Sequence, residues 1–238
     1  MKTAIIIGAS SGIGRELAKL FSRDGYVVGV TARRLELLTS LQAELPQPSY
    51  IKVMDVRQAP EARLLLEELI EEMGGVDVIV VSAGTGYLNL ELDWGKASDT
   101  IQTNVDGFVA LANAAMLHFI ARKRGHLVGI TSLAALRGSG DSPVYYASKA
   151  FQANYLQGLR KKATKLRLPI TVSDVQPGLV DTAMAKGDGL FWVATAEKAA
   201  QQIYRAIQRH KKLVVVTKRW RLIAWLMKTA PDFIYNRV

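Results

Sequence analysis

The chain lacks cysteine altogether among its 238 residues, which excludes disulfide bonds and any thiolate nucleophile or thiolate metal ligand. Its three histidines lack the close spacing of metal ligands, so we expect structural or surface roles for His118, His126 and His210. No apolar run reaches the roughly 20 residues that span a bilayer. The short apolar stretch at the N-terminus is expected to be a strand and not a signal peptide. We therefore expect a cytoplasmic protein without a metal site.

Linkers, repeats and low-complexity tracts are also missing, so a single domain over residues 1–238 is expected. Short apolar, β-branched runs recur with helical segments between them, at residues 3–7, 26–31, 50–54, 76–82, 126–131, 170–175 and 213–217. This alternation predicts an α/β, doubly wound (Rossmann) fold, with a seven-stranded parallel sheet and helices on both faces. Ligands of such sheets bind at the carboxyl ends of the strands.

A glycine-rich turn follows the first predicted strand and opens a helix with Leu17, Leu20 and Phe21 at helical spacing. Glycine lets the backbone approach an anion closely, and a helix N-terminus offers N–H groups and the positive end of a dipole. The turn is therefore predicted to bind phosphates, through Gly8, Ser10, Ser11, Gly12, Ile13 and Gly14. A tight turn without a ligand is the alternative.

Tyr145 and Lys149 lie four residues apart and share one face of a predicted helix. A nearby cation favours the phenolate and lowers the pKa of a tyrosine, which makes it a usable acid–base group. The neighbouring Tyr146 has Ala150 at the same spacing and so lacks a cation partner. An exposed tyrosine beside a lysine on a helix surface is the alternative.

Together these patterns resemble the short-chain dehydrogenase/reductase family over nearly the whole chain. The family's cofactor loop is matched by Gly8, Gly12 and Gly14, and its four catalytic positions are matched in order and spacing by Asn104, Ser132, Tyr145 and Lys149. The resemblance also implies that Asp55 meets the adenine ring and that Thr182 lies near the nicotinamide carboxamide. The further cofactor contacts that it implies are Val56, Ala83, Gly84, Pro177, Gly178 and Val180.

Two positions depart from the family's pattern. Ile7 stands where a threonine usually precedes the first glycine, and residues 81–84 read Val-Ser-Ala-Gly where the family has Asn-Asn-Ala-Gly. The usual residues help to tie the first and fourth strands together. We expect an apolar contact to replace that link, with Ser82 retaining part of it.

The resemblance implies a reaction in which hydride passes between NADP(H) and a carbonyl or alcohol substrate. Ser132 would donate a hydrogen bond to the carbonyl oxygen, and Tyr145 would deliver a proton to it. Lys149 would lower the pKa of the tyrosine and hold the nicotinamide ribose. Asn104 would position a water molecule that links Lys149 to solvent.

The end of the second predicted strand favours NADP(H) over NAD(H). NAD-dependent proteins of this fold usually carry an acidic residue there, whereas this chain has Ala32 followed by Arg33 and Arg34, with no acid before Glu36. The planar guanidinium of Arg33 suits the 2′-phosphate of NADP. A solvated basic pair is the alternative interpretation.

Residues 181–197 follow the sixth predicted strand and are expected to form a substrate lid, in which Gly187 and Gly189 permit bending. An apolar or lipid-like substrate is favoured by the apolar side chains of the lid and of the segment after the fifth strand, namely Met184, Leu190, Phe191, Trp192, Leu133, Leu136, Val144 and Tyr146. The lid aromatics are equally compatible with core contacts.

The formal charge of +10 leaves a second class of function open, a noncatalytic NADP-binding regulator or a nucleic-acid-binding protein. Basic stretches lie at residues 122–124, 160–162 and 209–212, but cations are common near helix ends, and no nucleic-acid motif accompanies them. The family resemblance implies instead a small-molecule substrate and a homodimer paired through helices near 97–123 and 143–167.

The C-terminal extension, residues 218–238, combines aromatic side chains with flanking cations. Trp220 and Trp225 lie among apolar residues, and the flanking cations are Lys218, Arg219, Arg221 and Lys228. Such a segment is too short to span a bilayer but suits the headgroup boundary, so one expectation is a peripheral membrane contact through residues 218–228. Packing on its own domain or on a partner subunit is the other.

Overall fold

The computed structural model describes residues 1–181, 192–217, 219–229, 231 and 235. Seven strands form one parallel sheet in the order β3-β2-β1-β4-β5-β6-β7. Their bounds are β1 (Thr3–Ile7), β2 (Val27–Ala32), β3 (Ser49–Val53), β4 (Val78–Val81), β5 (Gly125–Ile130), β6 (Ile170–Pro177) and β7 (Leu213–Val216). The predicted parallel sheet is confirmed, and no strand end differs from its expected position by more than two residues.

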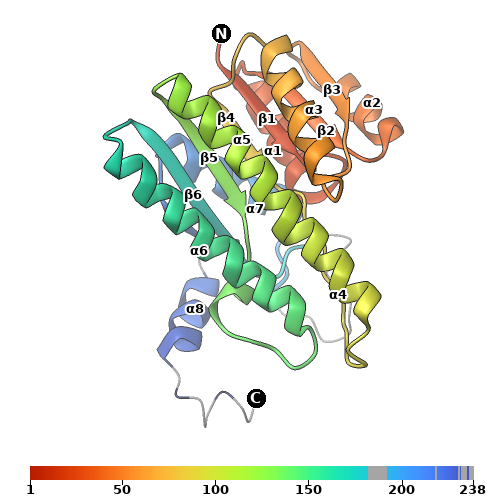
Figure 1. Cartoon of the computed structure of the whole chain (residues 1–238), viewed down its shortest axis with the longest axis vertical. Coiled ribbons are helices and arrows are strands. Elements are labelled where there is room, and N and C mark those ends of the chain that lie inside the picture. Colours follow the sequence, from red (N-terminus) through yellow and green to blue (C-terminus); the bar gives the residue numbers. More distant parts are fainter. Residues whose placement is uncertain (182–191, 218, 230, 232–234, 236–238) are drawn as a thin grey trace.

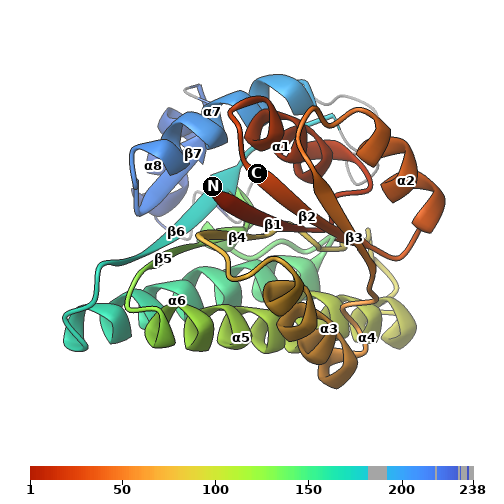
Figure 2. The ribbon, with the colours of Figure 1, turned by 90° about the horizontal axis from the view of Figure 1, so that it is seen from above.

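Helices cover both faces of the sheet, as predicted (Figure 2). One face carries α1 (Gly12–Arg23), α2 (Leu35–Ala43) and α7 (Ala196–Gln208), and the other carries α3 (Ala59–Glu72), α4 (Trp94–Ile101), α5 (Phe108–Ala121) and α6 (Pro143–Lys165). A π-helical turn, η1 (Gln102–Gly107), joins α4 to α5, and a 3-10 turn, η2 (Leu133–Leu136), follows β5. The last helix is α8 (Trp220–Thr229).

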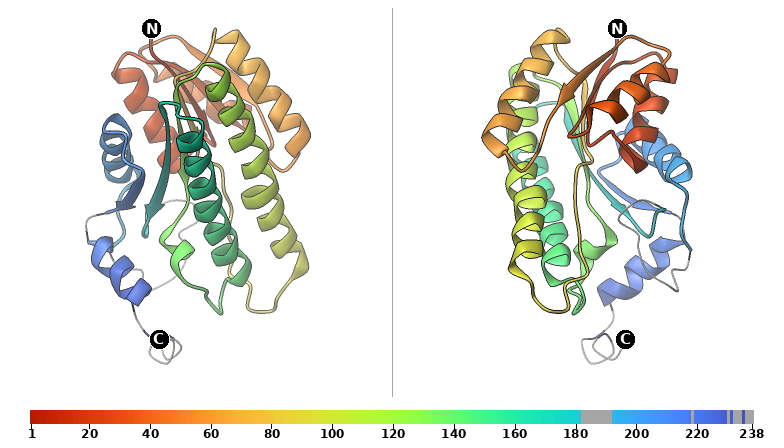
Figure 3. Two further views of the ribbon diagram at one scale, coloured as in Figure 1. Left: turned by 60° about the vertical axis from the view of Figure 1, so that its left-hand side comes forward. Right: turned by 90° about the vertical axis from the view of Figure 1, so that its right-hand side faces the viewer.

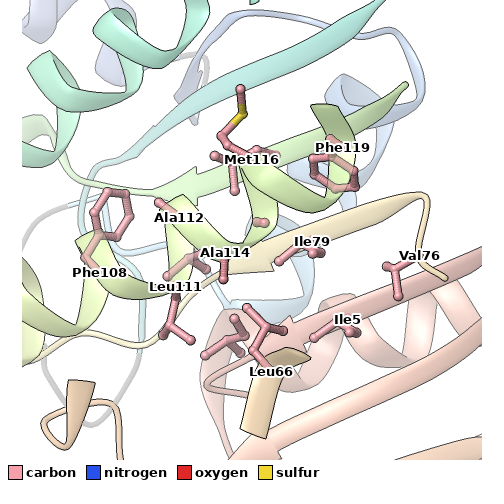
Figure 4. Close-up of a cluster of buried hydrophobic side chains, with 14 of the residues drawn as sticks. Ile5, Leu66, Val76, Ile79, Phe108, Leu111, Ala112, Ala114, Met116 and Phe119 are labelled. Atoms are coloured by element: carbon pink, nitrogen blue, oxygen red, sulfur yellow. The ribbon is translucent and has the colours of Figure 1, made fainter. Parts of the chain in front are cut away.

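The two layers bury two separate apolar cores, and alternate residues of the central strands point into each. Ile5 and Ile7 of β1 belong to the core beneath α3, α5 and α6, where Phe108 and Phe119 are fully buried (Figure 4). Ala4 and Ile6 belong to the core beneath α1 and α7. Because both faces of each central strand are covered, the strands read as continuous apolar runs.

Strands β1 and β4 are neighbours at the centre of the sheet, where the strand order reverses and a ligand crevice is expected. Ile7 pairs with Val81, and both side chains are buried in the same core. The Ser82 N–H donates to the Ile7 carbonyl at 2.8 Å. Ile7 and Val81, which replace the residues usual in the family, thus form an apolar contact between these strands, as the sequence led us to expect.

One helical stretch among the described residues, Trp94–Ala121, is long and apolar enough to cross a membrane, judged by length and composition only. The expectation that the chain has no such run is corrected to that extent. Half of the most apolar part of this stretch is buried inside the protein, because α5 packs against the sheet and α3. The core helix of a globular protein is also apolar around most of its circumference, because it is covered on most sides.

Candidate active site

Three segments bring the predicted reactive side chains to the carboxyl end of the sheet. Asn104 lies in η1, Ser132 follows β5, and Tyr145 and Lys149 lie in the first two turns of α6. Figure 1 shows α5 and α6 running side by side on one face of the sheet, with α4 continuing past the strand ends. The resulting cluster is therefore built on helices and a strand end, which hold side chains more rigidly than loops do.

The Ser132 side chain lies close enough to the Tyr145 hydroxyl to influence its pKa. Burial raises the pKa of Tyr145 above its usual value, and the contact with Ser132 opposes that shift. The expected net lowering of this pKa is corrected, because the shift is upward and Lys149 does not decide its direction. The lysine Nζ lies 5.8 Å from the centre of the tyrosine ring and makes its hydrogen bonds elsewhere, so burial decides the direction.

The Lys149 side chain is buried, with 3% of its surface exposed. Its Nζ donates to the Ile130 carbonyl at 3.3 Å and to Oε1 of Gln152 at 3.0 Å. Burial lowers the pKa of Lys149 to about 8, while the carboxylate of Asp174 on β6 opposes that shift. Burial thus makes this ammonium easier to deprotonate than that of an exposed lysine.

Asn104 is fully buried and ties the segment after β4 to α6. Its Oδ1 accepts from the Thr85 N–H at 2.9 Å, and its Nδ2 donates to the Thr85 carbonyl at 2.7 Å and to Ser148 Oγ at 2.9 Å. Ser148 Oγ in turn donates to the Tyr145 carbonyl at 2.7 Å. The asparagine side chain therefore positions the loop that faces Tyr145 and Lys149.

Two glycines of that loop allow the backbone to approach the reactive groups. A Cβ on Gly84 would lie 3.3 Å from both Lys149 Nζ and Asn104 Oδ1, and a Cβ on Gly86 would lie 2.5 Å from the Tyr145 ring. Gly86 and Gln152 both belong to the site and were missed by sequence reasoning. The loop glycine was a visible signal, whereas Gln152 reads as an ordinary helix residue.

The glycine-rich turn has the backbone geometry of an anion site. Gly8 and Gly12 adopt φ angles of 88° and 57°, and a Cβ on Gly14 would lie 2.2 Å from the Gly8 carbonyl oxygen. Ser11 is the N-cap residue of α1 but makes no capping bond with its side chain, and the first turn has no acidic residue. The N-terminal N–H groups of α1 therefore fit the phosphates of a dinucleotide.

Basic side chains lie beside this turn. Arg34 Nη2 donates to Ser10 Oγ at 3.1 Å, and Arg33 is exposed at the end of β2. Arg33 is close enough to Asp55 to help hold the pKa of that carboxyl below its usual value, although the hydrogen bonds from Arg57 have the largest effect. Arg57 reaches Asp55 Oδ2 at 2.6 Å. It was another residue that the sequence did not single out.

The segment after β6 begins at the same carboxyl edge of the sheet. The Gly178 N–H donates to the Val216 carbonyl at 2.6 Å, and Val180 forms a parallel bridge with Ala194. Thr182 and residues 182–191 of the expected lid lie outside the described residues. The segment predicted to be the lid extends to residue 197, but Ala196 and Glu197 belong to α7, which Thr195 caps.

Helix α8 packs on its own domain beside this segment. Trp220 and Ala224 are buried in a cluster with Leu133, and a Cβ on Gly178 would lie 2.4 Å from the Trp220 ring. Trp225 lies on the same helix and is 60% exposed. Of the two expectations for α8, packing on its own domain is therefore confirmed for its inner face.

The residues expected to line a substrate site divide among different surroundings. Leu133 and Leu136 contact the α8 cluster. Val144 borders a cavity of 10 Å³ beside Tyr145, whereas Tyr146 lines a separate groove of 290 Å³ that includes Ala150. Tyr145 and Tyr146 thus line different spaces. This agrees with the sequence, in which Tyr145 is followed four residues later by a lysine and Tyr146 by an alanine.

Replacing Trp220 with Ala is expected to release α8. Losing a buried tryptophan removes about 3 kcal/mol of packing free energy, so hydrogen exchange of the α8 amides should accelerate by roughly two orders of magnitude. The matched control is Trp225→Ala on the exposed face, with a change below about threefold. Equal acceleration in both variants would show that the inner face does not hold the helix.

The fold and the site have counterparts among known proteins. Residues 2–190 match the sequence model of the short chain dehydrogenase family. An uncharacterized oxidoreductase of Myxococcus xanthus is 36% identical over 189 residues, which are 77% of this chain and 74% of that protein. Serine dehydrogenase from Escherichia coli has a TM-score of 0.77 and 26% identity, over 90% of this chain and 95% of that one. The closed form of serine dehydrogenase complexed with NADP+ has a TM-score of 0.79 and 25% identity, over 90% and 94%. This chain belongs to the short-chain dehydrogenase family of oxidoreductases.

Proposed function

We propose that the protein interconverts a carbonyl and an alcohol with NADP(H), on an apolar or lipid-like substrate. The observation that carries the proposal is the contact of Tyr145 with Ser132 above the buried Lys149, at the carboxyl end of a sheet whose first turn fits a dinucleotide. When bound, the nicotinamide supplies or accepts hydride. The protein's part is to hold the substrate oxygen and to move its proton.

The tyrosine is the proton donor in the reductive direction. Because burial raises its pKa, Tyr145 carries its proton at neutral pH and has it ready for a carbonyl oxygen that gains negative charge. Ser132 lies next to it and stabilises the same oxygen with a second hydrogen bond. The Lys149 ammonium stabilises the phenolate that remains after transfer. The fixed Asn104 side chain keeps the facing loop in place.

Tyr145→Phe is expected to lower NADPH-dependent reduction of ketones by at least about 100-fold, because positioned proton donors contribute factors of that size. The ring and its packing on Gly86 are retained. Tyr146→Phe is the matched control, and its turnover should stay within about twofold of the native rate. The assay follows NADPH absorbance with a panel of aryl and alkyl ketones. Near-native turnover by Tyr145→Phe would refute the assigned role.

The preference for NADP(H) is supported by the two arginines after β2. Arg33 is exposed there, and the first acidic residue after β2 in the sequence is Glu36. Arg34 is held on the phosphate-binding turn by its hydrogen bond to Ser10. A complex of the related serine dehydrogenase contains NADP+. A 2′-phosphate at this edge would therefore meet two positive charges.

Arg33→Ala should weaken NADPH binding by about 10- to 100-fold, the value of one charge-assisted hydrogen bond of about 1.5–3 kcal/mol. NADH binding to the same variant should hardly change, since NADH has no 2′-phosphate. Fluorescence titration measures both affinities, with Arg63→Ala on α3 as a surface control. Equal affinity of the native protein for NADPH and NADH would contradict the preference.

Nucleic-acid binding is less well supported as the function. Two of the basic stretches serve the fold itself, because Arg122 Nη1 donates to the Val76 carbonyl at 2.7 Å and Arg160 Nε donates to the Val172 carbonyl at 3.1 Å. The presence of Tyr145 beside Ser132 and of the buried Lys149 also supports an enzyme over a noncatalytic regulator. We therefore keep a cytoplasmic enzyme with a small-molecule substrate as the proposal.

A peripheral membrane contact fits an apolar substrate, and we propose that the site end of the molecule makes it. The outer face of α8 exposes Leu222, Trp225 and Leu226 beside Arg221. Figure 3 shows α8 at the same end of the molecule as the start of α4, where Trp94 is 74% exposed. Exposed aromatics with neighbouring cations suit the headgroup region of anionic lipids.

Full-length protein should co-sediment at low salt with liposomes that contain phosphatidylserine, and high salt should weaken the interaction. Trp225→Ala should reduce the bound fraction severalfold, because it removes an exposed aromatic side chain from the contact face. Leu64→Ala, which changes an exposed apolar residue on α3, should not. Absence of co-sedimentation at low salt would remove the membrane proposal.

A homodimer is proposed from the outer faces of α5 and α6. Leu117 is 60% exposed and Phe151 is 39% exposed, and Phe151 stacks on Tyr155 with ring centres 5.8 Å apart. An apolar face on two long adjacent helices suits pairing with a second copy. Sedimentation should show a dimer at micromolar concentration, and Leu117→Glu should dissociate it. A native protein that sediments as a monomer would contradict the proposal.

A further inference from the structure

A buried glutamine bridges Lys149 and Asn104 of the site by hydrogen bonds, whereas the side chains of those two residues form no hydrogen bond with each other. Gln152 lies on α6, three residues after Lys149, and none of its surface is exposed. Its Oε1 accepts from Lys149 Nζ at 3.0 Å, and its Nε2 donates to the Asn104 carbonyl at 2.8 Å. Both ends of one amide are thus used inside the candidate active site.

The partners fix which way the amide points. An ammonium can only donate hydrogen bonds and a carbonyl oxygen can only accept them. The oxygen of Gln152 must therefore face Lys149, and its nitrogen must face Asn104. A reversed amide would place a donor against a donor and an acceptor against an acceptor, so the bridge has one orientation.

The surroundings of Lys149 make this bridge important. Among the described residues, the titratable groups that face its Nζ are Tyr145 on α6 and Asp174 on β6, and neither forms an ion pair with it. β5 presents the Ile130 carbonyl, and η1 presents Asn104. A buried charge without an ion pair depends on hydrogen-bond acceptors, and Gln152 makes the shorter of the two contacts that hold this one.

We propose that Gln152 is a positioning residue of the reaction, whose side-chain amide holds the Lys149 ammonium beneath Tyr145 and joins it to the Asn104 carbonyl. The amide links Lys149 to Asn104 directly, the two residues that the family resemblance connects through a water molecule. This inference rests on the proposed function for its catalytic meaning, but the bridge itself is a property of the protein alone.

An amide and a water molecule differ in what they do for a lysine. A water molecule can exchange with solvent and pass a proton along, whereas the amide only orients and stabilises the charge. Gln152 therefore orients the Lys149 ammonium and stabilises its charge with a fixed dipole. A glutamine that served only to support the π-helical turn η1 would have no such effect on Lys149.

Two substitutions at this position have opposite expected effects. Gln152→Met keeps an unbranched side chain of similar size but removes both hydrogen bonds, so the pKa of Lys149 should fall from about 8 by about one unit. Gln152→Glu places a negative charge beside the ammonium, so that pKa should rise by about one unit or more. Gln157→Met, at an exposed position of the same helix, should leave it unchanged.

The direct readout is the titration of Lys149 in full-length protein, followed by NMR of 13Cε-labelled lysine. The signal is assigned by its loss in Lys149→Arg. The order of pKa values predicted is Glu variant, native protein, Met variant, from highest to lowest. An unchanged Lys149 pKa in the Met variant would overturn the proposal, and this variant decides alone if the Glu variant does not fold.

The second readout is the pH profile of NADPH-dependent ketone reduction. Its alkaline limb should move to lower pH in Gln152→Met and to higher pH in Gln152→Glu, in parallel with the titration. Equal losses of rate without a shift of the limb would indicate structural support only and would count against the proposal. If the native protein reduced no carbonyl compound, the proposed function would fail, while the NMR titration would still decide whether the bridge controls Lys149.

Discussion

The ammonium group of Lys149 is buried without an ion pair, and the site is arranged around the acceptors that make this tolerable. Burial of a charge is costly unless hydrogen bonds compensate for the lost water. The Ile130 carbonyl at the end of β5 and the Gln152 amide on α6 supply those bonds. Gln152 then reaches the carbonyl of Asn104 in η1. One buried charge therefore fixes the relative positions of a strand end and two helical elements.

The site also requires close packing of the backbone, which glycine allows where the turn after β1 meets the segment after β4. A Cβ on Gly8 would lie 2.6 Å from the backbone nitrogen of Ala83, so the glycine-rich turn after β1 can lie directly against the segment after β4. That same segment carries Gly84 and Gly86, which face Lys149 and Tyr145. The glycine-rich turn and the candidate catalytic side chains are thereby held together at the centre of the sheet, where a ligand crevice is expected.

The features that local sequence controls were predictable. Apolar periodicity indicated all seven strands, and the spacing of Tyr145 and Lys149 placed them on one helical face. The bridge through Gln152 was not predictable, because its second partner is 48 residues away in the chain and only the packing of α6 on η1 brings them together. The direction of the Tyr145 pKa shift was missed for a similar reason, since spacing reports proximity and not burial. The inner face of α8 likewise depends on the fit of Trp220 to Gly178.

The central claim is that Tyr145 and Lys149 act as a unit and not as two independent groups. A double-mutant cycle in kcat/KM for ketone reduction, with Tyr145→Phe, Lys149→Met and the combined variant, tests this directly. If the two residues act as a unit, removing either one already abolishes the contribution of both. The combined variant should then be no slower than the slower of the two single variants. If the two losses multiplied instead, each group would contribute separately, and the account of one organised site would be contradicted.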